Sequence, residues 1–267
     1  IRETVTTQDT AGKVYLVGAG PGSPDLLTVK AFNLLRKAEV VVYDYLIDPD
    51  VLAHVPAEAE RFYAGKVGGG NQTPQDQINR LLIQKARQGK QVVRLKGGDP
   101  FLFGRGGEEA RALSAARIPF EIVPGISSAL AVPAYAGIPV THRGLSSSVA
   151  IVSAARAGDG EFSSQLRSAR AADTILVLMG VTHIRCIAAE LIANGRSANT
   201  PVAVIRWGTY ETQQTVVGSL MNIADLVERE GLLAPAVIVI GEVVRLRDEL
   251  NWFGKNFSQE KQMEAAA

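Results

Sequence analysis

The stretch VVRLKGGDPFLFGRGGEE, residues 92–109, places ionisable side chains among five glycines. Its apolar start predicts a buried strand, so the glycines that follow lie where open α/β sheets bind ligands. Gly97 and Gly98 let a ligand approach the main chain, and Asp99 adds a hydrogen-bond acceptor or a negative charge. Arg105 offers a planar fork of donors that suits carboxylates. A tight turn explains GGDP alone, but the added glycines, arginine and aromatics favour a binding loop.

An earlier loop, VYLVGAGPGSPDLLT, partly matches the dinucleotide-binding fingerprint Gly-x-Gly-x-x-Gly. Gly18 and Gly20 fit this pattern, but Ser23 stands where the third glycine belongs and Pro21 lies inside the turn. Asp44, at the end of the apolar run EVVVYD, would be the acid that binds a ribose. From these residues alone, a dinucleotide-binding oxidoreductase remains an alternative.

Composition narrows the class of protein. The chain has 267 residues and a formal net charge of +1, which gives no general reason to expect a nucleic acid or an anionic membrane as partner. Residues 1–12 lack the apolar segment of a signal peptide, and no apolar run reaches the ~20 residues that cross a bilayer. The single cysteine, Cys186, fits a reducing compartment and is expected to be an inert packing residue. We therefore expect a cytoplasmic protein.

The glycine loops need a framework, and the first half of the chain predicts one. Apolar strand candidates at 13–20, 39–44 and 90–98 alternate with helical periods at 23–38 and 72–89. Ser23 before Pro24 is a candidate N-cap for the first of these helices. Strands separated by helices indicate crossover connections, so we expect a mainly parallel sheet.

The second half predicts a different sheet. The turn-rich stretch GIPVTHRGLSSS marks the boundary between an N-terminal α/β lobe, 13–142, and a C-terminal α/β lobe, 143–253, with polar tails at 1–12 and 254–267. Strand candidates at 201–207 and 213–218 are joined by a connection short enough for a hairpin. The C-terminal sheet should therefore be mixed.

The two glycine loops closely resemble the signature stretches of the uroporphyrinogen-III C-methyltransferases, within the tetrapyrrole methylase family. The resemblance extends to VVYDYLI, AGK, VPGISSA, AGIPVTHRG and PAVIVIGEVV, in the expected order. It implies a two-lobed α/β fold, a homodimer, and S-adenosylmethionine, without a metal, in the cleft between the lobes. The cofactor contacts that it implies are Pro21, Gly97, Gly98, Asp99, Leu102, Ser127, Ser128, Met179, Gly208 and Ala236.

By this resemblance, the reaction methylates uroporphyrinogen III at C2 and then C7, giving precorrin-2 by way of precorrin-1. The resemblance implies Asp44 as proton acceptor, Lys66 as proton donor and Arg105 as a group that orients the reacting pyrrole. Arg105 and Arg143 would bind the carboxylates of the substrate. Glu108 would belong to the same substrate site by holding the Arg105 guanidinium. The alternatives are a capping role for Asp44, a solvated charge for Lys66 and a surface salt bridge between Arg105 and Glu108.

One departure from the family pattern affects the second lobe. Where members often have Thr-Gly-His, this chain has Ser153, Ala154 and Ala155, so a possible hydrogen-bond or proton-transfer partner is missing and Arg156 is the candidate to replace it. A tetrapyrrole methylase that acts on a later corrin precursor is the second alternative. The sequence leaves open whether the product serves sirohaem, cobalamin or haem d1 synthesis.

Overall fold

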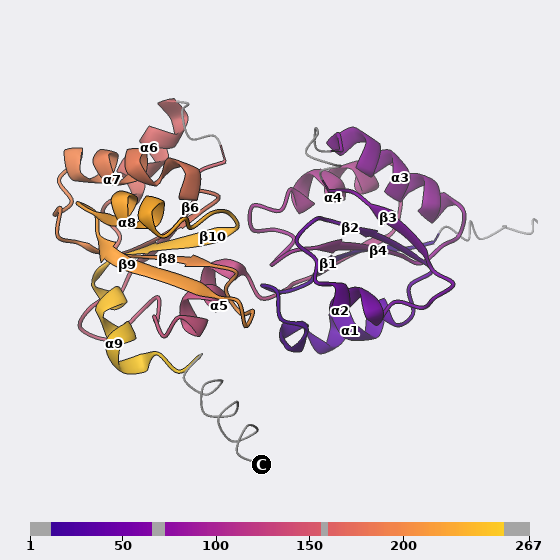
Figure 1. Ribbon diagram of the computed structural model, residues 1–267. Helices are drawn as coiled ribbons and strands as arrows, with labels where there is room; N and C mark the ends of the chain where they lie inside the picture. Colours follow the sequence, from indigo (N-terminus) through magenta and orange to yellow (C-terminus); the bar gives the residue numbers. More distant parts are fainter. Residues whose placement is uncertain (1–11, 66–72, 156–159, 254–267) are drawn as a thin grey trace, which may run out of the picture. The chain divides into compact units, whose positions relative to one another are not determined.

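The computed structural model describes residues 12–65, 73–155 and 160–253. The chain divides into two compact units, one ending at Ser127 and the other beginning at Ser128, and each unit contains one sheet with its helices (Figure 1). The sequence predicted the boundary between residues 142 and 143, which is later in the chain than the observed one and lies beyond α5 (Ser128–Tyr135). This helix contacts two strands of the second sheet, so it belongs to the second unit.

The first unit is built on a parallel sheet, as the alternating pattern predicted. Its strand order is β3-β2-β4-β1-β5, and each neighbouring pair is parallel. The strands are β1 (Val14–Gly18), β2 (Val40–Tyr43), β3 (Glu60–Tyr63), β4 (Val92–Lys96) and β5 (Phe120–Val123). The edge strand β3 was not predicted, because its residues are largely exposed and carry no apolar run.

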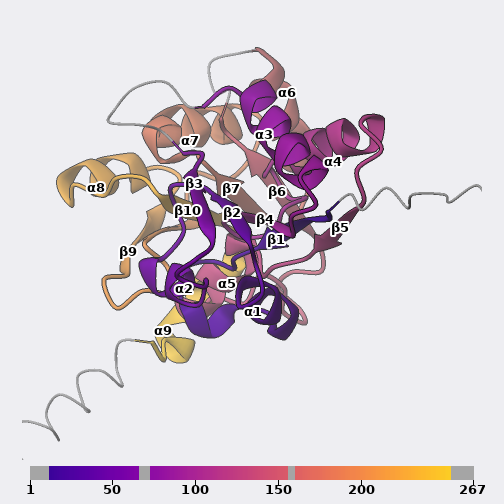
Figure 2. The ribbon, with the colours of Figure 1, turned by 90° about the vertical axis from the view of Figure 1, so that its right-hand side faces the viewer.

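Helices cover both faces of this sheet (Figures 1 and 2). On one face, α1 (Val29–Leu35) and α2 (Pro49–Ala53) pack on Val93 and Leu95 of β4. On the other, α3 (Gln75–Arg87) and α4 (Gly106–Ala115) pack on a cluster that contains Val92. Because side chains alternate along a strand, the even-numbered residues of β4 point toward α3 and α4.

The start of the first helix differs from the prediction. The side chain of Thr28, rather than Ser23, accepts the N-terminal hydrogen bond of α1, from the N–H of Ala31. The residues Pro24–Leu26 form a separate short 3-10 turn. Proline fits both kinds of first turn, so Pro24 alone did not distinguish a 3-10 turn from an α-helix.

The second unit has the mixed sheet that the hairpin predicted. Its order is β6-β7-β10-β8-β9; β6 and β7 are parallel, and the other pairs are antiparallel. The strands are β6 (Val149–Ser153), β7 (Thr174–Leu178), β8 (Pro201–Arg206), β9 (Gln214–Ser219) and β10 (Ala236–Ile240).

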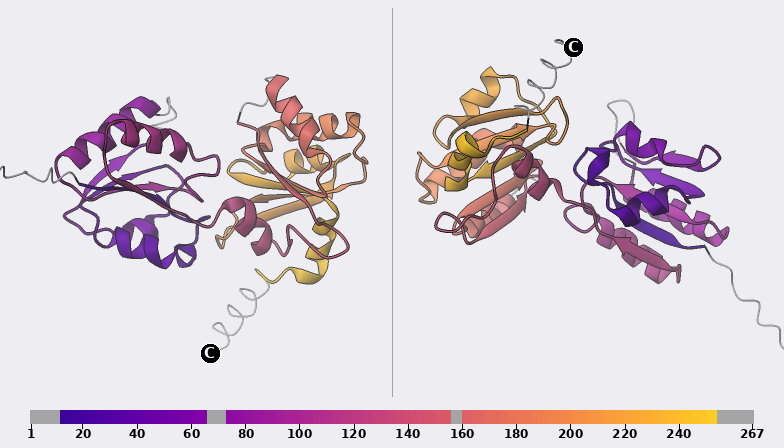
Figure 3. Two further views of the ribbon diagram at one scale, coloured as in Figure 1. Left: turned by 180° about the vertical axis from the view of Figure 1, so that it is seen from behind. Right: turned by 90° about the horizontal axis from the view of Figure 1, so that it is seen from below.

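Helices α6 (Gly160–Ala169), α7 (Ile184–Ala193) and α8 (Ile223–Arg229) enclose the main core of this unit, while α5 lies on the opposite face of the sheet (Figures 1 and 3). A short 3-10 turn, Val181–His183, precedes α7. A second, Glu242–Leu246, follows β10 and leads into α9 (Arg247–Leu250). The expected packing role of Cys186 is wrong, because its side chain lies on the exposed side of α7. No helix in the described ranges is long and apolar enough to cross a bilayer.

Candidate active site

Three loops meet at the carboxyl edge of the first sheet, after β1, β4 and β5. Gly20 and Gly98 exchange two backbone hydrogen bonds, 3.3 Å and 2.6 Å between nitrogen and oxygen. A Cβ atom on Gly18 would lie 2.5 Å from the oxygen of Gly98, and one on Gly125 would lie 2.3 Å from the same oxygen. These glycines therefore allow the loops to contact each other, in addition to any role in admitting a ligand.

The dinucleotide interpretation does not fit this arrangement. In the fingerprint, the glycine turn leads directly into a helix whose N-terminus holds the pyrophosphate. Here the backbone of Gly20 is bonded to Gly98, and α1 begins only at Val29, after the 3-10 turn. The helix N-terminus that would bind the pyrophosphate is therefore absent from the end of this loop.

In the loop after β4, Asp99 is held by hydrogen bonds, whereas Gly97 has free space beside it. One carboxylate oxygen of Asp99 accepts from the N–H of Phe101 at 2.8 Å, and the other accepts from the N–H of Gly125 at 3.1 Å. Asp99 thus ties this loop to the one after β5, a role that its sequence position did not reveal. A Cβ on Gly97 would meet only Leu46, at 3.8 Å, so space remains there for a ligand. Leu102 is half-buried.

Arg105 precedes α4 in a left-handed conformation, with φ of 58°. Its guanidinium donates two hydrogen bonds of 2.8 Å to Glu108, which is the contact expected from the sequence. The hydrogen bond to Glu108 raises the pKa of Arg105, and the same bond lowers the pKa of Glu108. Both side chains are about half exposed, so the pair is accessible to a ligand.

A cluster of buried charges lies beside Asp44, and sequence reasoning assigned it no role. Arg94 and Lys96 project from β4 toward Glu109 of α4, and only 2%, 3% and 0% of these residues is exposed. Arg94 donates to Asp44 at 2.6 Å and to Glu109 at 2.9 Å. The nitrogen of Lys96 lies 3.1 Å from Glu109 and 3.8 Å from Asp44. The sequence could have revealed this cluster, because Arg94 and Lys96 are two residues apart in VVRLK and therefore lie on the same face of a buried strand.

Burial and neighbouring charges act on these cations in opposite directions. Burial lowers the pKa of Lys96, and the charge of Arg94 adds to this effect. Burial also acts against the charged form of Arg94, but the carboxylates of Asp44 and Glu109 outweigh it and raise the pKa of Arg94. The second oxygen of Glu109 is buried and has no hydrogen-bond partner among the described residues.

The remaining predicted residues lie mainly in the second unit. Met179 follows β7 with φ of 58° and is 50% exposed. The last residue of β7, Leu178, pairs with Val237 of β10. Ala236, the first residue of β10, is opposite Arg206 at the end of β8. Gly208 follows β8, and a Cβ there would lie 2.5 Å from the side chain of Val132 on α5. These predicted cofactor contacts therefore share one edge of the second sheet.

The other predicted residues lie elsewhere in the chain. Ser127 ends the first unit and Ser128 begins α5, while Arg143 is exposed in the turn between His142 and Ser146. Pro21 is half-buried before the first 3-10 turn. Lys66 lies outside the described residues, as does Arg156.

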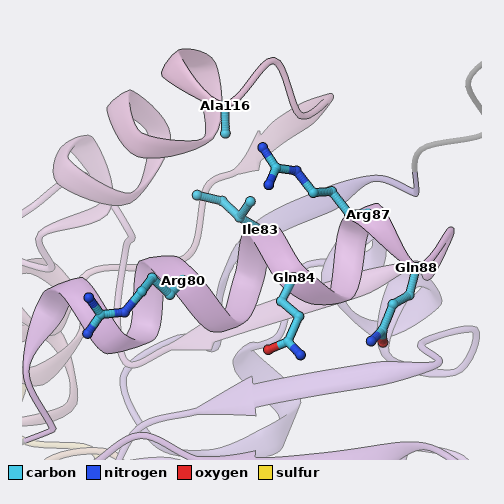
Figure 4. A pocket seen from close by; sticks show the side chains of 6 residues that line it. All are labelled: Arg80, Ile83, Gln84, Arg87, Gln88 and Ala116. Atoms are coloured by element: carbon cyan, nitrogen blue, oxygen red, sulfur yellow. The ribbon is translucent and has the colours of Figure 1, made fainter.

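A separate hollow of about 530 Å³ lies along the C-terminal half of α3 (Figure 4). Its lining is Arg80, Ile83, Gln84, Arg87, Gln88 and Ala116. This part of α3 precedes β4, so the hollow is remote from the glycine loops at the carboxyl edge of the sheet. Arg80 is paired with Asp76 at 2.6 Å, and most of the lining side chains are exposed. No group in the described structure that could hold a metal ion was found.

The chain is similar to known proteins over most of its length. Residues 13–224 match the family described as Tetrapyrrole (Corrin/Porphyrin) Methylases. A protein of Methanosarcina barkeri named S-adenosyl-L-methionine-dependent uroporphyrinogen III methyltransferase is 52% identical over 90% of this chain and 94% of its own length. The chain spans about half of the siroheme synthases it matches: the Chromobacterium violaceum protein is 48% identical over 93% of this chain and 53% of its own length.

A solved structure supports the fold. The Thermus thermophilus uroporphyrin-III C-methyl transferase, complexed with S-adenyl homocysteine, has a TM-score of 0.75 and 43% identity. The match covers 88% of this chain and 94% of that one.

Proposed function

Because the chain belongs to the tetrapyrrole methylase family, as its two glycine signatures predicted, we propose that it transfers methyl groups from S-adenosylmethionine to uroporphyrinogen III. The near-full-length match to the Methanosarcina methyltransferase carries this proposal. The Thermus structure, which holds the demethylated cofactor, supports the same choice of methyl donor. The products would be precorrin-1 and then precorrin-2, which sirohaem, cobalamin or haem d1 synthesis would consume.

The described residues fit the proposed cofactor. The open side of Gly97 leaves room for a ligand beside the main chain, and the half-exposed sulfur side chain of Met179 offers a polarizable surface for an adenine ring. Leu102 and Ala236 are each partly exposed and apolar, which suits contact with the cofactor. When bound, S-adenosylmethionine supplies an electrophilic methyl group.

Residues of the chain itself would then bind the substrate carboxylates and transfer protons. A pyrrole carbon that gains a methyl group leaves the ring cationic, so a ring proton must leave. Asp44 is the proposed acceptor, because part of its carboxylate is exposed at the carboxyl edge of the sheet while Arg94 holds one oxygen. Lys66 remains the proposed donor. Arg105 and Arg143, both exposed, would bind substrate carboxylates.

Anaerobic incubation with uroporphyrinogen III and methyl-labelled S-adenosylmethionine tests the proposal. Mass analysis should show products that carry one and then two labelled methyl groups. If the protein binds S-adenosylhomocysteine tightly but does not methylate uroporphyrinogen III, the proposed substrate is wrong. A panel of later corrin precursors would then identify the correct substrate. If the protein binds NAD tightly and does not bind S-adenosylhomocysteine, the proposed cofactor is wrong.

A further inference from the structure

The first turn of α4 contains two neighbouring glutamates with different surroundings. Glu108 points outward and holds Arg105, whereas Glu109 is fully buried and holds Arg94 and Lys96. Gln75 of α3 also donates to Glu109, at 3.2 Å. Every contact of Glu109 with a cation therefore leads to a residue that itself faces Asp44.

Stability alone is a poor reason for this cluster. Burying charged groups removes them from water, and replacing a buried ion pair with apolar residues of similar volume is often neutral or stabilising. The strand β4 is otherwise apolar, and the cores on both of its faces consist of apolar residues, so apolar side chains at positions 94 and 96 would match their surroundings. The position of the cluster beside a candidate proton acceptor supplies a different reason.

We propose that Glu109 is a positioning residue that acts through Arg94 and Lys96 to fix the place and the charge environment of the Asp44 carboxylate. The inference rests on the proposed function, in which Asp44 accepts the proton. Arg94 holds one carboxylate oxygen of Asp44, and Lys96 lies near the other. Glu109 balances the second positive charge, so the four groups together are neutral.

The proposal fixes the sign of two charge changes. The charged groups near Asp44 in the described structure are Arg94 and Lys96 of β4, with Glu109 behind them. Tyr63, at the end of β3, is a titratable but neutral neighbour. A nearby positive charge favours an ionised carboxylate, and a negative charge disfavours it. Removing the charge of Lys96 should therefore move the titration of Asp44 to higher pH. Removing the charge of Glu109 as well should move it back down.

A stepwise series tests this with S-adenosylhomocysteine bound: the parent, Lys96→Met, and the double variant Lys96→Met with Glu109→Gln. Carboxyl-carbon NMR with isotope-labelled aspartate follows the titration, and Asp44→Asn assigns the signal. We expect the first step to raise the midpoint by about one pH unit and the second to lower it by a similar amount. Glu108→Gln is the matched control, and it should leave the Asp44 midpoint within ~0.3 pH units of the parent.

The double variant restores charge balance, so it keeps the test valid if the single variant folds poorly. An Asp44 midpoint that stays near the parental value in both variants, or that moves in the same direction at both steps, overturns the inference. The acid limb of kcat, measured in parallel, separates the two proposals. If the NMR midpoint moves as expected and the kcat limb does not follow, the positioning by Glu109 stands and Asp44 is not the proton acceptor.

Discussion

The contact between the three glycine loops can be tested with one methyl group, in the variant Gly125→Ala. Gly125 has an ordinary φ, so alanine introduces no backbone strain there. Its Cβ, however, would lie 2.3 Å from the oxygen of Gly98 and 2.8 Å from the Cα of Gly18, which are both backbone atoms. Relief of this overlap requires one loop to move by about 1 Å, because non-bonded atoms prefer separations of roughly 3.5 Å.

Such a displacement has two measurable costs. Inserting a methyl group into a tightly packed region typically costs about 1–3 kcal/mol, so we expect the free energy of unfolding to fall by about 2 kcal/mol in denaturant titration. The overlap with Gly98 presses on the loop after β4, which also carries Gly97 and Leu102 and is tied to Gly125 through Asp99. Calorimetry should therefore show at least a ~10-fold weaker affinity for S-adenosylhomocysteine, equivalent to about 1.4 kcal/mol.

Gly107→Ala is the matched control, since it adds the same methyl group to another glycine of the same stretch. A Cβ on Gly107, inside α4, meets nothing within 4 Å. Alanine is the better helix former, so this variant should be stabilised by up to about 1 kcal/mol and keep its affinity for S-adenosylhomocysteine. If Gly125→Ala matches the parent in both measurements, the loops are not in the close contact from which the argument starts.

Three further predictions follow from the described contacts. Asp44→Asn should keep affinity for S-adenosylhomocysteine and slow single-turnover methylation by ~100-fold, whereas an unchanged rate would return Asp44 to a capping role. Arg105→Lys should lower that rate by at least ~30-fold, because lysine cannot reproduce the fork, and a rate within about threefold of the parent would leave Arg105 as a surface salt bridge. Lys13 and then Lys30 lower the pKa of Glu121 to about 2, so Glu121 should stabilise the fold above about pH 5, with the contribution lost as pH falls toward 2. Chemical denaturation of Glu121→Gln across this range should show a difference from the parent of no more than ~1 kcal/mol that disappears in acid; a difference that persists there would contradict the ionic cause.

The sequence alone predicted most of the strands and the hairpin, because these elements depend on the pattern of neighbouring residues. The run VVRLK is apolar apart from two charges, and it forms the central strand β4. The short connection after residue 207 predicted the β8–β9 hairpin, because only an antiparallel pair can be joined so directly. The apolar runs before the glycine stretches also placed the glycine loops at the carboxyl edge of the first sheet, where the structure has them.

Features that depend on long-range contacts were not predictable in this way. Nothing near Glu109 in the sequence distinguishes it from Glu108, and only the packing of α4 on β4 makes one buried and the other exposed. Gly18 and Gly125 are required because of Gly98, which is far from both in the chain. Likewise, the role of Asp99 depends on the N–H of Gly125. Sequence patterns report the need for a small or charged residue, but its partner is set by the fold.

The start of α4 explains how one local feature serves two parts of the site. A Cβ on Gly106 would lie 2.4 Å from the oxygen of Pro100, and the N–H of Gly106 donates to that same oxygen at 3.0 Å. The helix start is thereby fixed against the GGDP turn. Successive helix residues point about 100° apart, so fixing this start directs Glu108 toward Arg105 and Glu109 toward β4. Because one rigid helical turn carries both glutamates, a rotation of α4 would disturb the proposed pyrrole-orienting group and the proposed proton acceptor together.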